Sequence, residues 1–155
     1  MTKEVYFRKF NGQKIENIEE YVNEYTLSHP DVEIMIGTDS QNRGDYTYYS
    51  TVIALYNPRH GAHCIYKKWK TERERNRPTR LMNEVWYSVE LAEYLMSKGV
   101  KKPKYIDIDV NPSPKYKSNE VYPSATGLIE GMGYEVRYKT LCPLVTTMAD
   151  WVVKH

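Results

Sequence analysis

Apolar positions recur along the chain at two different periods, and the change between them marks out its elements. Ile15, Ile18, Val22 and Tyr25 are spaced as on one face of a helix, which predicts an amphipathic helix from Ile15 to about Leu27. Short stretches rich in Val, Ile, Thr and Tyr, bounded by turn residues, predict strands. These stretches lie at residues 32–39, 46–56, 62–70, 105–110 and 134–141.

Three further segments have helical patterns. The longest covers residues 79–98 and is followed by Gly99, a residue that commonly ends a helix. A second covers about 119–131, and a third begins at Pro143 and runs to the C-terminus. The expected order is therefore helix, three strands, helix, strand, helix, strand, helix.

This order predicts an α/β fold with a mixed five-stranded sheet, in which three antiparallel strands precede two more, flanked by helices. Residues 4–10 read as a short edge segment or arm before the first helix. A chain of 155 residues without a visible linker is expected to form one domain. Within it, residues 1–31 form the arm and extra N-terminal helix, and residues 32–155 form the rest.

Composition narrows the class of protein. The apolar fraction is 41% and the net charge +2, and no apolar run approaches the roughly 20 residues needed to span a bilayer. The N-terminus has no secretory pattern, so a cytoplasmic protein without a membrane partner is expected.

Cys64 and Cys142 have no CxxC spacing, and His60, His63 and Cys64 lack a fourth ligand, so a zinc-type site is not expected.

Positive charge is concentrated between Lys67 and Arg80, where the local net charge is +5. This basic loop leads into the long helix and suits contact with a phosphate backbone, although a solvated loop is the alternative. Trp69 and Tyr116 could stack on bases or simply pack. The candidate phosphate ligands are Lys68, Lys70, Arg73, Arg75, Arg77 and Arg80.

Two acidic residues occupy unusual positions in these elements. Asp39 follows the apolar run Ile34–Ile36, as a metal ligand at a strand end would, although turn chemistry alone can place Asp there. Glu84 shares a helical stripe with Leu81, Ser88 and Leu91 and so faces the core. A core carboxylate requires a partner, which could be a metal ion or a buried Arg or Lys.

Three more aspartates are candidates. Asp107 and Asp109 lie on one face of the 105–110 strand, where either could approach Asp39 or form an exposed polar edge. Asp150, in the last helix, lies opposite its apolar stripe and by periodicity alone could be a surface residue.

The element order and the acidic residues together resemble the ribonuclease H-like superfamily. Three segments look most like its YkuK-type branch, an uncharacterised bacterial and phage group: Ile36-Gly37-Thr38-Asp39-Ser40-Gln41, Tyr105 to Asn111, and Met148-Ala149-Asp150. The resemblance covers about residues 32–155. The loop from Lys139 to Thr147 has no histidine, unlike that of ribonucleases H proper, and Asp39 does not begin the DxE pair of proofreading exonucleases.

The resemblance implies four catalytic and metal-binding residues, Asp39, Glu84, Asp109 and Asp150, with Asp107 as the fallback for Asp109. In this superfamily such residues hold two divalent ions, usually Mg²⁺ or Mn²⁺. The implied function is hydrolysis of nucleic acid, DNA or RNA, by a metal-dependent nuclease. The alternatives are a catalytically weak or inactive module that binds nucleic acid or a protein partner, and a fold in which the acidic residues only form salt bridges. The sequence gives no indication of oligomeric state.

Overall fold

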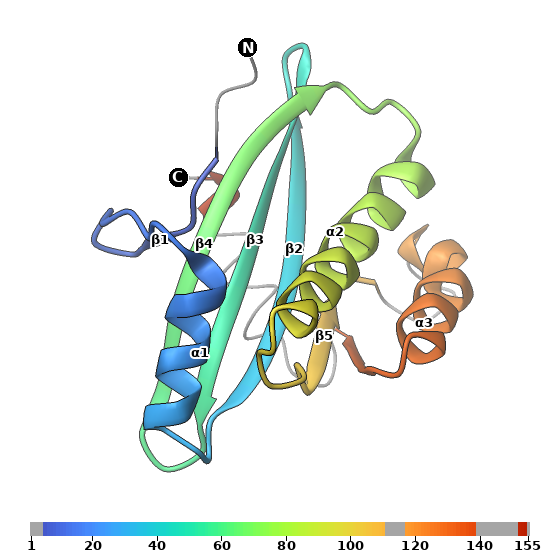
Figure 1. The fold of residues 1–155 in the computed structure, drawn as a ribbon. Helices are drawn as coiled ribbons and strands as arrows, with labels where there is room; N and C mark the ends of the chain where they lie inside the picture. Colours follow the sequence, from blue (N-terminus) through green and yellow to red (C-terminus); the bar gives the residue numbers. More distant parts are fainter. Residues whose placement is uncertain (1–4, 111–116, 139–151, 155) are drawn as a thin grey trace.

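The computed structural model describes residues 5–110, 117–138 and 152–154, in which one mixed sheet has the strand order β1-β4-β3-β2-β5-β6 (Figure 1). β1 to β4 pair antiparallel, whereas β2, β5 and β6 run parallel. The strands are Arg8–Lys9 (β1), Glu33–Arg43 (β2), Tyr46–Asn57 (β3), Gly61–Glu72 (β4), Tyr105–Ile108 (β5) and Glu135–Tyr138 (β6). The helices are Ile18–Ser28 (α1), Arg77–Ser97 (α2), Tyr122–Gly131 (α3) and the short 3₁₀ helix Lys117–Val121 (η1).

The mixed α/β class expected from the sequence is confirmed, with one strand more than expected among the described residues. The extra strand is β1, in which Arg8 and Lys9 pair with Tyr66 and Ile65 of β4. A strand of two residues is too short to show an alternating pattern of apolar and polar side chains in the sequence. They pair because the outer edge of β4 offers backbone groups that need hydrogen-bond partners.

The central hairpins are longer than the sequence suggested. β2 does not end at Asp39 but continues to Arg43, which pairs with Tyr46 across a two-residue turn. Gly44 supplies the positive φ of 57° that such a turn favours. β4 likewise continues to Glu72. The segment expected to be a basic loop is therefore strand up to Glu72 and helix from Arg77.

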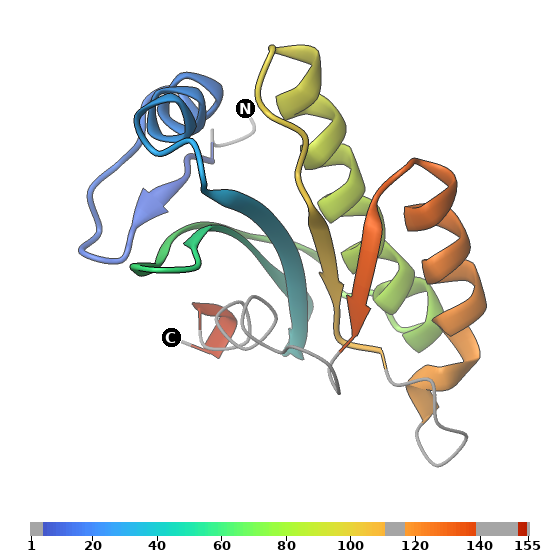
Figure 2. The same ribbon diagram turned by 90° about the horizontal axis from the view of Figure 1, so that it is seen from below.

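Helices α1 and α2 lie on one face of the sheet, and residues 152–154 lie on the other (Figure 2). α2 begins at Arg77 because the side chain of Asn76 accepts a hydrogen bond from the Thr79 amide, with Pro78 in the first turn. The larger core lies between the sheet and these helices. A smaller core on the opposite face contains Met35, Val52, Ala54 and Val152.

α1 is fixed to β4 by aromatic and polar contacts. The Tyr21 hydroxyl lies 2.6 Å from Nε2 of His63, and the Tyr25 ring stacks on the same imidazole at 5.2 Å between centroids. Burial lowers the pKa of His63, and the charge of Lys9 lowers it further. His63 therefore takes part in docking α1.

Parts of the predicted chain lie outside the described residues. These are most of the predicted last helix with Asp150, and the 111–116 loop with Tyr116; of the last helix, residues 152–154 are described and are helical. Among the described helices, none combines the length and the apolar character needed to cross a membrane.

Candidate functional site

Asp39 lies where two neighbouring strands part. β5 pairs with β2 only from Met35 to Gly37 and ends at Ile108, whereas β2 continues beyond it. Continuing the parallel register by two residues brings Asp39 level with Asp109. Asp39 is buried, although it lies in the middle of its strand and not at its end. The candidate site therefore lies where β5 ends beside β2.

Helix α2 presents a row of polar side chains to β2 at this point. Ser88 Oγ lies 2.7 Å from Oγ1 of Thr38, and one turn earlier Glu84 accepts a hydrogen bond from Ser40 Oγ at 2.5 Å. One turn earlier again, Arg80 donates to Oγ of Ser40 at 2.7 Å and to its carbonyl at 3.2 Å. The spacing of four residues places all three on one helix face. This row fixes the position of the Glu84 carboxylate.

The pKa of Glu84 is strongly perturbed by its surroundings. Burial raises its pKa well above the ordinary value of 4.5, and the negative charge of Asp39 raises it further. The hydrogen bond from Ser40 lowers the pKa, Asp109 raises it, and Arg80 lowers it. Among the described residues Glu84 makes no direct ion pair, because Arg80 reaches it only through Ser40. The site therefore brings the negative charges of Asp39 and Asp109 close to a buried carboxyl group, an arrangement that a bound cation would stabilise.

Asp109 and Asp107 have different surroundings although both border the hollow beside Glu84. Arg137 of β6 forms a bidentate ion pair with Asp107. Its Nε lies 2.9 Å from Oδ1 and a terminal nitrogen lies 3.0 Å from Oδ2. Arg137 also lies over the Tyr105 ring at 4.4 Å. Asp107 thus has a strong cationic partner. Asp109, half-buried after the end of β5, acts electrostatically on Glu84.

Three of the four predicted ligands, Asp39, Glu84 and Asp109, are brought to this end of the sheet, and the fourth, Asp150, lies outside the described residues. In the described ranges, no three acidic, histidine or cysteine side chains already form a metal-binding group. The described structure therefore brings these acidic residues to one region without arranging three of them as a metal-binding group.

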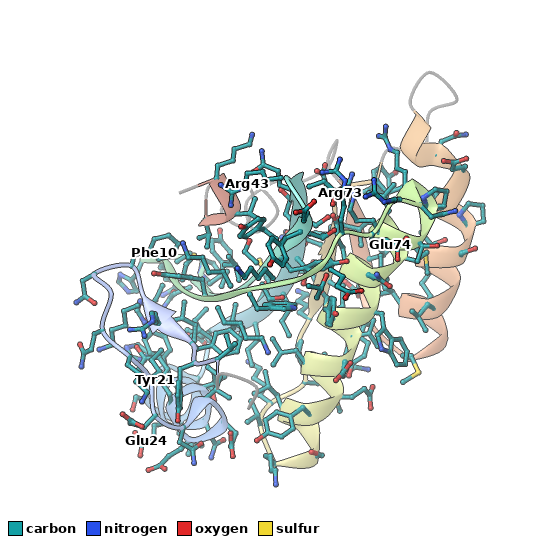
Figure 3. The ribbon with its side chains drawn as sticks, turned by 90° about the horizontal axis from the view of Figure 1, so that it is seen from above. Phe10, Tyr21, Glu24, Arg43, Arg73 and Glu74 are labelled. Carbon is teal, nitrogen blue, oxygen red and sulfur yellow. The ribbon has the colours of Figure 1, made fainter. Side chains whose placement is uncertain are left out.

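The predicted phosphate ligands divide into three groups. Lys68 and Lys70 are exposed on β4, Arg75 is exposed in the segment before α2, and Arg77 is exposed at the first residue of α2. Arg73 donates to the Gly44 carbonyl at 2.8 Å and ties the segment before α2 to the β2–β3 turn. Figure 3 shows Arg73 toward α2 and Arg43 on the side of residues 152–154. Arg80, half-buried on Ser40, has contacts that suit positioning of Glu84 better than contact with a phosphate.

Sequence reasoning missed three residues of the site. Ser40 links Arg80 to Glu84, and alternation along β2 could have placed it on the face of α2. Arg137 was a charged residue in a short predicted strand, which should have suggested a partner such as Asp107. Gln41, on the same face of β2 as Asp39, has a buried Oε1 without a hydrogen-bond partner in the described structure.

The charge cluster leads to a prediction for Glu84. Because its folded-state pKa lies above the unfolded value, the folded chain binds the extra proton between pH 4.5 and the raised pKa, and stability falls as pH rises through that window. A glutamine at position 84 cannot ionise, and its side-chain oxygen can still accept the hydrogen bond from Ser40. In metal-free buffer, Glu84→Gln is therefore expected to be more stable than wild type at pH 8, by about 1–3 kcal/mol, with little difference at pH 4.5.

Thermal melts in EDTA from pH 4.5 to 8.5 measure this difference. Glu130→Gln, the same change on an exposed position of α3, is the control and should give a difference that is small at every pH. A Glu84→Gln protein that is less stable than wild type at pH 8 would contradict the assignment of a strained carboxyl.

Comparison with known proteins agrees with the fold. The ribonuclease H-like family matches residues 13–154, a region that includes α1 as well as all strands except β1. No protein with a curated description matches the chain. Because the family match extends over most of the sequence, the chain belongs to the ribonuclease H-like family.

Proposed function

We propose that the protein is a divalent-metal-dependent nuclease that hydrolyses phosphodiester bonds in nucleic acid. The observation that carries this proposal is the state of Glu84: it is buried, its pKa is raised, and the charges of Asp39 and Asp109 lie beside it. Buried like charges are costly without a counter-ion, and a divalent cation provides one.

The residues present fit such a cation. Among the described residues, the candidate ligands near the end of β5 offer carboxylate, amide or hydroxyl oxygens, the ligand type that Mg²⁺ and Mn²⁺ prefer. Oε1 of Gln41, which has no hydrogen-bond partner among the described residues, adds an oxygen on the Asp39 side of β2. Arg80 and Ser40 hold Glu84 in place, as hydrogen-bonded surroundings hold the carboxylate ligands of metal sites.

We assign the metal ligands as Asp39, Glu84, Asp109 and Asp150, with Asp107 as the fallback, and two Mg²⁺ or Mn²⁺ ions as the cofactor. Bound ions of this kind supply an activated water and stabilise the leaving oxygen. The chain itself orients the carboxylates, and the exposed cations Lys68, Lys70, Arg75 and Arg77 bind backbone phosphates. Placement in the YkuK-type branch is part of this proposal and is supported by the sequence segments around Asp39, Asp109 and Asp150.

The experiment that tests the proposal combines metal binding with cleavage. Mn²⁺ is expected to raise the melting temperature of the wild-type protein at pH 8, because it binds the folded site and not the unfolded chain. Labelled single-stranded, duplex and hybrid oligonucleotides are then incubated with Mg²⁺ or Mn²⁺. No cleavage of any substrate would overturn the nuclease assignment, and a retained Mn²⁺ shift would then favour an inactive binding module.

Asp107 and Asp109 can be separated by the same melts. Asp109→Asn is expected to abolish most of the Mn²⁺-induced rise in melting temperature, since it removes a proposed metal ligand. Asp107→Asn is expected to lower the starting stability, because it leaves Arg137 buried without its full partner, while preserving the shift. The reverse pattern would make Asp107 the ligand.

A further inference from the structure

A second feature of the sheet lies on the face opposite α1 and α2. It is a hollow of about 200 Å³ whose lining includes Arg43 from β2, Tyr48 from β3, Lys68 and Lys70 from β4, and Val153. We call this group the Tyr48 pocket. Its described lining contains three cations and no acidic side chain. The pocket is therefore suited to an anion.

The strand register places the Tyr48 pocket on the same face as Asp39. Asp39, Ser50 and Lys68 form one row across β2, β3 and β4, and Gln41, Tyr48 and Lys70 form the next row on that face. Two interstrand spacings separate Asp39 from Lys68, or about 10 Å. An extended nucleic-acid strand spans this distance within a few nucleotides, so the pocket and the carboxylates can serve one strand.

Besides the cations, the Tyr48 pocket contains an aromatic ring on which a base can stack. The Arg43 guanidinium lies 4.1 Å from the Tyr48 ring centroid, and Lys70 Nζ lies 4.2 Å from that of Tyr46. Tyr46 has 41% of its surface exposed. Aromatic rings beside cations bind single strands, because unpaired bases stack on the rings while the cations contact phosphates. Bases within a duplex already stack on one another and offer only their edges.

We infer that the Tyr48 pocket binds one nucleotide of a single-stranded nucleic acid, with the base on Tyr48 and the phosphate between Lys68 and Lys70. This inference rests on the proposed function and makes it more specific, because it selects single strands over duplexes. Sequence preference is expected to be weak, since every base has a face that can stack.

The test is a binding titration in EDTA, which prevents metal-dependent cleavage. A fluorescent single-stranded 15-mer is titrated with wild-type protein and variants, with DNA and RNA versions and the matching duplex in separate titrations. Tyr48→Leu is expected to weaken single-strand binding about tenfold, whereas Tyr48→Phe, which keeps the ring, stays close to wild type. Lys68→Ala with Lys70→Ala is expected to reduce the slope of log K against log salt by about 1.4.

Lys98→Ala, an exposed cation at the end of α2, is the matched control and should change the affinity little. Duplex binding as tight as single-strand binding, or a Tyr48→Leu protein with unchanged affinity, would overturn the inference. Melting curves of each variant establish that it is folded. Cleavage measured separately with Mn²⁺ distinguishes the two proposals: cleavage without an effect of Tyr48→Leu on binding overturns only the pocket, and Tyr48-dependent binding without cleavage overturns only the nuclease.

Discussion

Replacing Asp39 with asparagine is expected to reduce metal-dependent cleavage roughly 100-fold or more. Changes to residues that only support a metal ligand cost about 10–100-fold in metal affinity or activity, and loss of a ligand should exceed that. Asn has nearly the same shape as Asp but removes a negative charge that raises the pKa of Glu84. The metal-free protein should consequently keep or slightly increase its stability, while the Mn²⁺-induced rise in melting temperature disappears.

Initial rates with Mn²⁺ and an oligonucleotide that the wild-type protein cleaves measure this effect, and melts with and without Mn²⁺ measure the metal response. Asp31→Asn, the same substitution at an exposed position before β2, is the matched control. A folded Asp39→Asn protein that cleaves at the wild-type rate would remove Asp39 from the catalytic site. If Mn²⁺ raises the melting temperature of Asp39→Asn as much as that of the wild-type protein, the ion binds at a site that does not include Asp39.

Truncating Arg137 is expected to cause the largest loss of stability. Arg137 and Asp107 face each other across β5 and β6, and only 2% of the Asp107 surface is exposed. Breaking a buried ion pair by removing one partner typically costs about 3–5 kcal/mol, because the other charge remains buried. For a protein of this size, Arg137→Ala should therefore lower the melting temperature by about 10 °C.

The matched control is Arg59→Ala, which removes an exposed guanidinium from the β3–β4 turn and should alter the melting temperature by less than about 2 °C. The combined change of Asp107→Leu with Arg137→Met should recover much of the lost stability, since it removes both charges and preserves side-chain volume. If Arg137→Ala melts like wild type, the pair does not contribute to folding and Asp107 becomes available as a metal ligand.

The elements that the sequence predicted well are those with a strong local period. The 79–98 helix corresponds to α2, since its apolar stripe repeats over several turns and a capping residue precedes it. The three long strands also agree, because β-branched and aromatic residues fill them. The limits of β2 and β4 were wrong because polar residues at hairpin ends resemble turn residues, and only pairing with β3 shows that Gln41–Arg43 and Thr71–Glu72 are strand.

The sequence by itself determined which carboxylates could matter. Glu84 stood out because a helix period assigns its side chain to the core, and this inference required no other part of the chain. The alternation of Asp107 and Asp109 also followed from the strand period, but that period placed both on one face and could not distinguish them.

Only the tertiary structure decided how the acids differ, because their environments come from contacts distant in sequence. Arg137, on a separate strand, forms a bidentate pair with Asp107. β5 pairs with β2 only as far as Gly37 and ends beside the middle of β2 near Asp39, which no local pattern encodes. Asp39 and Asp109 raise the pKa of Glu84, whereas Ser40 and Arg80 lower it, and burial adds the largest effect. The sequence supplied the charges, and long-range packing set the free energy of holding them together.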